Sequence, residues 1–180
     1  MVSTFHIDPA HSSIQFSVRH MMISNVRGAF TGVKGTVVYD PDNLSASSVH
    51  AEIDPATIHT FDTQRDTHLK SPDFLDVEQF PTIEFRSSKV EKSGDGFKII
   101  GDLTIHGVTK QTALTVDDIA PEAKDPWGNT RVGASARAKI NRTDFGLSWN
   151  AALEAGGFLV GEELKLEFDV ELVKVQRAAA

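Results

Sequence analysis

Apolar and polar residues alternate along much of this chain with a period of two. Because successive side chains of a strand point to opposite faces, each alternating run predicts a strand with one apolar and one polar face. The runs cover residues 12–19, 48–53, 97–106, 131–140 and 163–172. The last is the clearest, with Leu164, Leu166, Phe168, Val170 and Leu172 separated by charged residues.

Turn-forming sequences separate the predicted strands, at 40–43, 93–96 and 125–129. The turn at 93–96 predicts a tight hairpin between strands near 82–92 and 96–106. About eight strands fit the chain, and long strands with a single apolar face favour a closed barrel over a small sandwich. We therefore predict an all-β fold, a single eight-stranded antiparallel barrel formed by one domain over 1–180.

Two segments, 62–75 and 150–156, break the alternation and predict short helices. Asp62 suits a helix N-cap, and Asp66 and Lys70 are four residues apart on one helix face. Ser71 and Pro72 suit the start of a second helical turn, while Gly156 and its neighbour Gly157 would end a helix over 150–156. Both segments fall between strands, where a lid over one barrel end would lie.

Charge and composition narrow the classes of partner. The net charge of −7 argues against nucleic acid and anionic membrane surfaces as partners. Without cysteine, the chain has no disulfide, thiolate metal site or cysteine nucleophile. The N-terminus shows no secretory signal, which predicts a cytoplasmic protein, although a periplasmic chain whose signal had been removed would look the same.

A membrane barrel would show the same alternation, with its apolar face turned toward lipid. The heavily charged polar faces and the lack of aromatic girdles favour the soluble form. We therefore expect no stable membrane insertion. The oligomeric state stays open, with a homodimer as one alternative.

Seven histidines raise the question of a metal site. None forms an HExxH motif or a pair spaced to share one face of a strand or helix. His20, His68 and His106 each lie at the end of a predicted element, so the fold could bring them together. Hydrogen bonding to loops or to a ligand head group is favoured over metal binding, and we predict no metal site.

Small residues on the apolar faces suggest internal space. Ala134, Ala136 and Ala138 lie on one predicted strand, Gly101 on another and Ala51 on a third. An eight-stranded barrel is just wide enough to be filled by side chains or to hold one ligand. The alternative is a barrel packed solid by aromatic rings, for which the candidates are Phe16, Phe85, Phe97 and Phe168.

One face of the predicted helix carries polar side chains that could bind a ligand beside the predicted barrel opening. Arg65, His68 and Leu69 share this face by spacing, and an Arg–His pair could bind a phosphate or a quinone carbonyl. The alternative is that Arg65 pairs with Asp62 or Asp73 and only pins the helix.

Ordered motifs along nearly the whole chain resemble those of the YceI-like, polyisoprenoid-binding family. No single motif is decisive, but their ordered set is specific. They are Ile7-Asp8-Pro9-Ala10-His11-Ser12, Phe16-Ser17-Val18-Arg19-His20-Met21, Val26-Arg27-Gly28-Ala29-Phe30, Arg65-Asp66-Thr67-His68-Leu69-Lys70-Ser71-Pro72-Asp73-Phe74, Gly101-Asp102-Leu103-Thr104-Ile105-His106-Gly107-Val108-Thr109 and Asn141-Arg142-Thr143-Asp144-Phe145-Gly146-Leu147.

The resemblance implies a lipocalin-like barrel that binds, stores or transports a polyprenyl lipid or isoprenoid quinone, with no required cofactor and no enzymatic activity. An enzyme acting on an amphiphilic isoprenoid through His and Arg groups at the opening is the alternative. The candidate ligand-binding residues are Phe16, Val18, Arg19, His20, Met22, Phe30, Arg65, His68, Leu69, Phe74, Phe85, Leu103, His106, Ala134, Ala136, Trp149 and Phe168.

Overall fold

Strands and turns make up most of residues 1–176, the part of the chain that the computed structural model describes. The last four residues of the predicted domain, 177–180, lie outside the described residues. The strands are β1 (Ser3–Ile7), β2 (Ser13–His20), β3 (Ser24–Phe30), β4 (Val33–Tyr39), β5 (Ser48–Ile53), β6 (Ile58–His59), β7 (Ile83–Ser93), β8 (Gly96–Ile105), β9 (Val108–Ile119), β10 (Ala123–Lys124), β11 (Thr130–Asn141) and β12 (Val160–Lys174). The helix is α1 (Thr63–Lys70), and 3-10 turns are η1 (Pro9–His11), η2 (Leu44–Ala46), η3 (Pro55–Thr57) and η4 (Arg142–Phe145).

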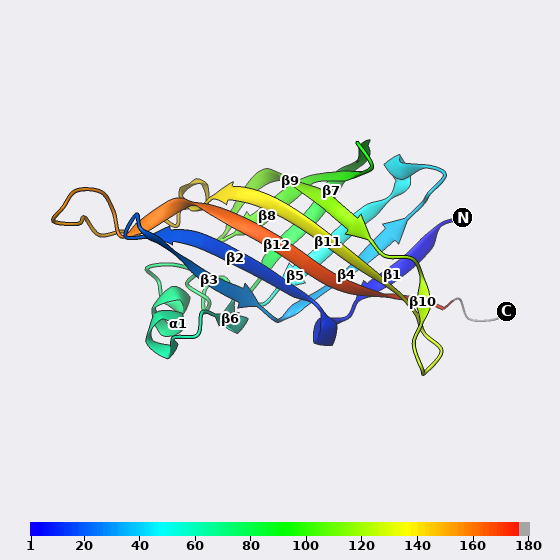
Figure 1. Ribbon diagram of the computed structural model, residues 1–180, viewed down its shortest axis with the longest axis horizontal. Helices are drawn as coiled ribbons and strands as arrows, with labels where there is room; N and C mark the ends of the chain where they lie inside the picture. Colours follow the sequence, from blue (N-terminus) through cyan, green and yellow to red (C-terminus); the bar gives the residue numbers. More distant parts are fainter. Residues whose placement is uncertain (177–180) are drawn as a thin grey trace.

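Three of the barrel strands are bent and are therefore divided into two segments each. β12 pairs with both β1 and β2. On their other side, β1 pairs with β4 and β2 pairs with β3. The sheet continues with β5 beside β4 and β6 beside β3. With each bent strand counted once and the two-residue β10 left aside, eight antiparallel strands form the wall, and pairing of β11 with β12 closes it. The predicted eight-stranded, lipocalin-like barrel is confirmed (Figure 1).

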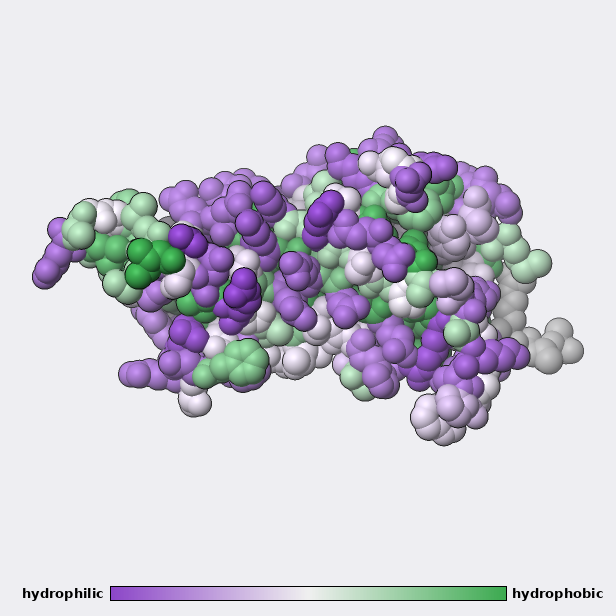
Figure 2. Space-filling view, in the orientation of Figure 1, coloured by the Kyte–Doolittle hydropathy of each residue, from purple (hydrophilic) through white to green (hydrophobic). Residues whose placement is uncertain are grey.

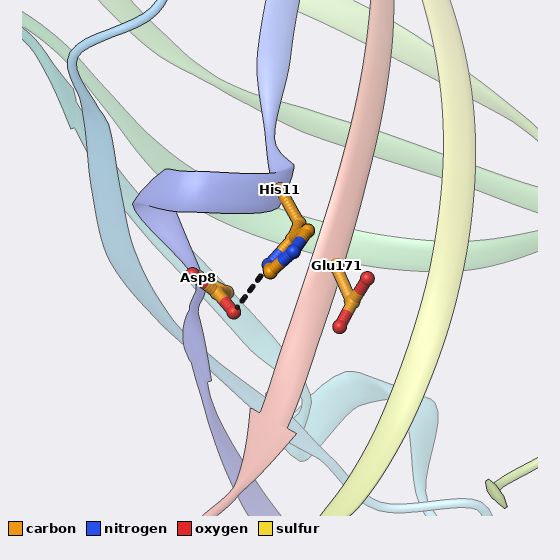
Figure 3. Close-up of side chains that lie close together, drawn as sticks. All are labelled: Asp8, His11 and Glu171. Atoms are coloured by element: carbon orange, nitrogen blue, oxygen red, sulfur yellow. Dashed lines mark hydrogen bonds and ion pairs between the residues drawn. The ribbon is translucent and has the colours of Figure 1, made fainter. Parts of the chain in front are cut away.

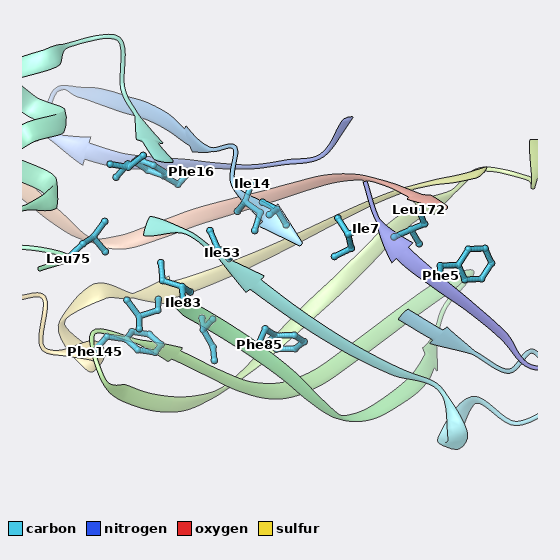
Figure 4. Close-up of a cluster of buried hydrophobic side chains, with 14 of the residues drawn as sticks. Phe5, Ile7, Ile14, Phe16, Ile53, Leu75, Ile83, Phe85, Phe145 and Leu172 are labelled. Atoms are coloured by element: carbon cyan, nitrogen blue, oxygen red, sulfur yellow. The ribbon is translucent and has the colours of Figure 1, made fainter. Parts of the chain in front are cut away.

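The apolar faces of the strands point into the barrel, as the alternation predicts. Buried side chains run along its length, from Leu75 and Phe145 near α1 to Phe5 of β1 and Leu172 near the end of β12 (Figure 4). The predicted hairpin is also present, because β7 and β8 pair up to Ser93 and Gly96. Among residues 1–176, no helix has the length and apolar character needed to cross a membrane.

One end of the barrel is covered by α1 and the turns that follow it, with the 147–159 segment projecting beside them (Figure 1). We call this the capped end. The prediction of a helix after Asp62 is correct, since the Asp62 carboxylate accepts a hydrogen bond from the backbone N–H of Arg65 at 2.9 Å. The N-terminus and the end of β12 lie toward the opposite end, which we call the open end.

The prediction of helix is wrong for residues 71–75, the end of the first segment, and for residues 150–156. Ser71 caps the C-terminus of α1 by donating from its N–H and its hydroxyl to His68 O, so residues 71–75 form turns and not a second helix. Residues 150–156 form an irregular loop because the Asn150 side chain bonds both the N–H and the carbonyl of Val160. The amide of Asn150 thereby fixes a chain reversal that a helix would prevent.

Candidate ligand-binding site

An apolar cavity of about 500 Å³ runs along the inside of the barrel. Its volume lies within the range of roughly 300–1,000 Å³ that is common for small-molecule sites. Every strand except β10 contributes to its lining, together with Leu69 of α1 and Phe74 and Leu75 after it. Among the lining residues, only Glu122 and Arg142 have charged side chains. The cavity therefore suits a ligand whose surface is mostly hydrocarbon.

The two ends of the cavity differ in their exposure to solvent. At the capped end, Phe74, Leu75 and Arg142 are all buried. The exposed lining residues lie toward the open end: Ser48, Ile119, Ala120 and Glu122. The cavity is thus closed under α1 and open at the end where the N-terminus and the end of β12 lie.

Ten of the seventeen predicted ligand-binding residues line this cavity. They come from both sides of the barrel and from the cap, and their contact with a ligand stays a prediction. They are Phe16, Val18, Phe30, Leu69, Phe74, Phe85, Leu103, Ala134, Ala136 and Phe168. The other seven do not line it: Arg19, His20, Met22, Arg65, His68, His106 and Trp149.

The small residues on the apolar faces have two different roles. Ala51, Ala134 and Ala136 line the cavity and leave it open. At Gly101, however, an added Cβ would lie 2.7 Å from Phe85 Cζ and would clash with the carbonyl oxygen of Arg86. The Phe85 ring therefore fills the space over Gly101. The prediction of internal space holds at the three alanines, and the prediction of aromatic packing holds at Gly101.

Arg65 and His68 belong to the cap and not to the cavity lining. Arg65 donates from Nε to the Thr60 hydroxyl at 2.8 Å and from Nη2 to the Thr60 carbonyl at 2.7 Å. His68 Nε2 is bonded to the Asp73 carboxylate at 2.8 Å, and its ring packs edge-on against Trp149 at 4.8 Å. Arg65 pins α1 through Thr60, and not through the carboxylates of Asp62 or Asp73 as the alternative prediction had it.

The remaining polar candidates also lie outside the cavity lining. Arg19 is exposed and donates to the Met22 carbonyl, and His20 ends β2 opposite Val160. His106 occupies the β8–β9 turn with φ of 53°, and its ring lies 4.5 Å from that of Phe80. No cluster of potential metal ligands among residues 1–176 includes His20 or His106.

The main polar group of the lining, Arg142, was not among the predicted site residues. Its side chain is 3% exposed and donates to four backbone carbonyls, at 2.5–3.3 Å, and burial lowers the pKa of its guanidinium. The acceptors are the carbonyls of Leu147, Trp149, Val160 and Gly161. A charged residue directly after an alternating strand, inside a family motif, is the signal that could have identified it.

Two clusters of carboxylates and histidine lie outside the cavity lining. Asp8, His11 and Glu171 meet near the open end, where His11 Nδ1 lies 2.9 Å from Asp8 Oδ2 (Figure 3). Arg131 binds the carboxylates of both Asp8 and Glu171, and its guanidinium lowers the pKa of Asp8 from 3.8 to about 2. The cation thus already occupies the position that a metal ion would need.

The second cluster combines His50, Glu52 and Glu84 on β5 and β7. Lys34 pairs with Glu52 at 2.9 Å, and Arg86 pairs with Glu84 at 2.5 Å. Each carboxylate of this cluster therefore has its own cationic partner. The expectation that the protein holds no metal stays a prediction.

The closed antiparallel wall, the helical cap and the apolar interior together define a lipocalin-like barrel with an internal cavity. Within this class, the chain belongs to the YceI-like family, because the model of the YceI-like domain matches residues 5–172. Among curated proteins, UPF0312 protein SAS2572 of Staphylococcus aureus strain MSSA476 is 36% identical over 171 residues, which cover 94% of this chain and 97% of that protein. UPF0312 protein SA2479 of strain N315 is 35% identical over the same length.

Solved structures with the same fold include three from different bacteria. BcnA of Burkholderia cenocepacia is 21% identical with a TM-score of 0.76, over 92% of this chain and 98% of that one. The YceI protein of Campylobacter jejuni is 28% identical with a TM-score of 0.69, over 88% and 90%. A polyisoprenoid binding domain from Saccharophagus degradans, implicated in plant cell wall breakdown, is 14% identical with a TM-score of 0.63, over 95% and 98%.

Proposed function

We propose that this protein binds one long apolar isoprenoid molecule in the barrel cavity and stores, transports or protects it. The observation that carries the proposal is the elongated cavity itself, with its apolar lining and only two charged side chains. Burial of hydrocarbon is worth about 0.8 kcal/mol per methylene, so a cavity of this kind can bind a prenyl tail tightly without specific polar contacts. The likeness to a structure described as a polyisoprenoid binding domain supports the same class of ligand.

The ligand's polar end is expected at one end of the cavity, where the polar lining groups lie. Arg142 at the capped end suits a carbonyl or phosphate oxygen, since a guanidinium is a strong donor to both. Ser48 and Glu122 at the open end would leave the polar end near water. An isoprenoid quinone and a polyprenyl phosphate or alcohol are the candidate ligands.

No observation favours the enzymatic alternative. The His and Arg side chains predicted for it do not line the cavity, and Arg65 and His68 are bonded to Thr60 and Asp73. We therefore propose binding without turnover and without a required cofactor.

The two tryptophans allow both binding and orientation to be measured. Trp149 lies at the capped end against Phe74, and Trp127 is in the β10–β11 loop toward the open end. Titration of Trp127→Phe and Trp149→Phe with ubiquinone should give saturable quenching near one ligand per chain. The tryptophan quenched more strongly marks the end that holds the quinone ring.

Organic extraction of purified protein, followed by mass spectrometry, gives an independent test. A polyprenyl compound near one per chain is the expected result. If the extract contains no isoprenoid and neither tryptophan shows saturable quenching, the proposed function is wrong.

A further inference from the structure

Four large apolar side chains are exposed together at the capped end. Met21, Met22 and Ile23 form the turn between β2 and β3, and Phe158 belongs to the neighbouring 147–159 segment. Their exposed fractions are 42%, 61%, 74% and 61%. We call these four residues the tip. Figure 2 shows apolar surface gathered at the end of the molecule from which they project.

The two loops of the tip are held against each other. The Met21 N–H donates to the Leu159 carbonyl at 2.8 Å, and Met22 lies so close over Gly157 that an added Cβ there would clash with its sulfur. Met21 and Met22 both have positive φ, 49° and 63°, a conformation that is uncommon for residues other than glycine. The fold thus keeps a costly turn that presents apolar side chains to solvent.

The tip is also poor in charge. Residues 147–161 contain one charged side chain, Glu154, and residues 21–26 contain none, in a chain that is 24% charged. Arg19 lies directly behind the tip, where its guanidinium donates to the Met22 carbonyl at 3.2 Å. An apolar surface backed by an arginine is the arrangement by which proteins bind at the boundary between lipid tails and phosphates.

The loop that carries Phe158 is part of the cavity wall. Leu147 and Val160, near its two ends, line the cavity, and Arg142 binds the carbonyls of both. The only β-bridge within this segment joins Ala152 to Phe158, so it has no ladder pairing with the barrel strands there. A surface that held the tip would therefore lie against the capped end of the cavity.

We propose that the tip docks on the surface of a lipid bilayer and places the capped end of the cavity against it. This inference rests on the proposed function, because a long isoprenoid is poorly soluble in water and has to be collected from or delivered to an apolar phase. A second copy of the chain fits less well, since a stable protein interface uses roughly 20–30 residues a side and the tip offers four large side chains.

Flotation with phosphatidylcholine vesicles tests the proposal, with Ile23→Asp/Phe158→Asp as the tip variant. These two side chains are exposed, so folding and thermal stability should be unchanged. The wild type should bind vesicles, and the variant should lose about tenfold or more in affinity, because two apolar insertions are replaced by charges. Trp127→Asp is the matched control at the open end, where an 82% exposed side chain is changed, and its vesicle affinity should equal that of the wild type.

The net charge of −7 gives a second expected result. Replacing part of the phosphatidylcholine with phosphatidylglycerol should weaken binding, and added salt should restore it. Failure of the wild type to bind neutral vesicles, or equal binding by the tip variant, overturns the proposal. So does a dimer, seen by light scattering, that the tip variant abolishes in the absence of lipid.

Titration with ubiquinone in vesicle-free solution separates this inference from the proposed function. Unchanged ubiquinone binding by the tip variant, together with lost vesicle binding, is the expected result. Ubiquinone binding without vesicle binding by the wild type overturns the docking alone. Vesicle binding by a protein that takes up no isoprenoid overturns the proposed function.

Discussion

Two arginines at opposite ends of β11 are held by different kinds of hydrogen-bond partner. Arg142, just after β11 at the capped end, is surrounded by four backbone carbonyls and has no carboxylate among its hydrogen-bond partners. Arg131, near the start of β11, binds the carboxylates of Asp8, Asp125 and Glu171. Burial lowers the pKa of Arg142, whereas its three carboxylate partners raise the pKa of Arg131.

The difference shows how each end is held. Peptide carbonyls do not titrate, so the bonds of Arg142 tie the 147–161 segment to the barrel at any ordinary pH. The acceptors of Arg131 are carboxylates, so its bonds weaken when acid protonates them. The capped end is thus fixed by buried dipoles and the open end by partly exposed charges.

The largest expected effect follows from loss of the buried arginine. Arg142→Met keeps much of the apolar side chain but removes the donor to the carbonyls of Leu147, Trp149 and Gly161, while the Val160 carbonyl keeps the Asn150 amide. This loss should cost about 3–5 kcal/mol of unfolding free energy. Urea denaturation measures this loss. Arg137→Met is the control, because Arg137 is 68% exposed beside Asp117 and its loss should cost less than about 1 kcal/mol. Equal losses in the two variants would contradict the conclusion that Arg142 holds the 147–161 segment against the barrel.

The next effect concerns the wall between the two arginines, where Ala136 lines the cavity. Ala136→Phe should place its ring in open space, so long isoprenoids should no longer bind while thermal stability changes little. Gly101→Ala should do the reverse, since the added methyl meets the Phe85 ring and the Arg86 carbonyl and should destabilise the barrel by about 1–3 kcal/mol.

Thermal melts and ubiquinone titrations of both variants check this contrast. If Ala136→Phe unfolds the protein, or still binds a long tail, the two ends are not joined by a continuous cavity.

The barrel and its inner face could be predicted from the sequence because both depend on a local period of two. Phe16, Ala136 and Phe168 are examples of residues placed in the lining by alternation alone. Alternation within one strand cannot show whether the space over a small residue such as Gly101 is filled, because the Phe85 ring that fills it comes from the neighbouring strand.

The polar ends could not be predicted, because their side chains bind partners distant in the sequence. Arg142 reaches Val160 and Gly161, 18 and 19 residues away, and Arg131 reaches Asp8, 123 residues away. Spacing correctly predicts that Arg65 and His68 lie on α1. It does not predict the direction of their side chains, which bonds to Thr60 and Asp73 determine.

A smaller effect is expected from acid at the open end. Arg131 and His11 hold the pKa of Asp8 at about 2, below its ordinary 3.8, so Asp8 stabilises the fold fully above pH 3.8 and loses this contribution as the pH falls toward 2. The pKa of Asp125 is lowered in the same way, first by Arg131. Arg131→Met should therefore move the acid-unfolding midpoint, followed by circular dichroism, to higher pH. An unchanged midpoint would show that these carboxylates do not hold the open end.

The smallest effect is expected for Arg65. Like Arg142, it holds a neighbouring segment by hydrogen bonds, but it binds Thr60 alone and not four carbonyls. Thr60 is 2% exposed, and its carbonyl accepts from Arg65 Nη2, so Arg65→Ala should cost about 1 kcal/mol of unfolding free energy. Since Arg65 does not line the cavity, the affinities for a prenyl alcohol and for a quinone should both stay unchanged. Selective loss of quinone binding would instead restore the head-group role that helical spacing predicts for Arg65, and would mean that the cap turns this side chain inward when ligand binds. Paired titrations of Arg65→Ala and Arg65→Lys distinguish the two, because lysine keeps the charge but not the two-pronged contact with Thr60.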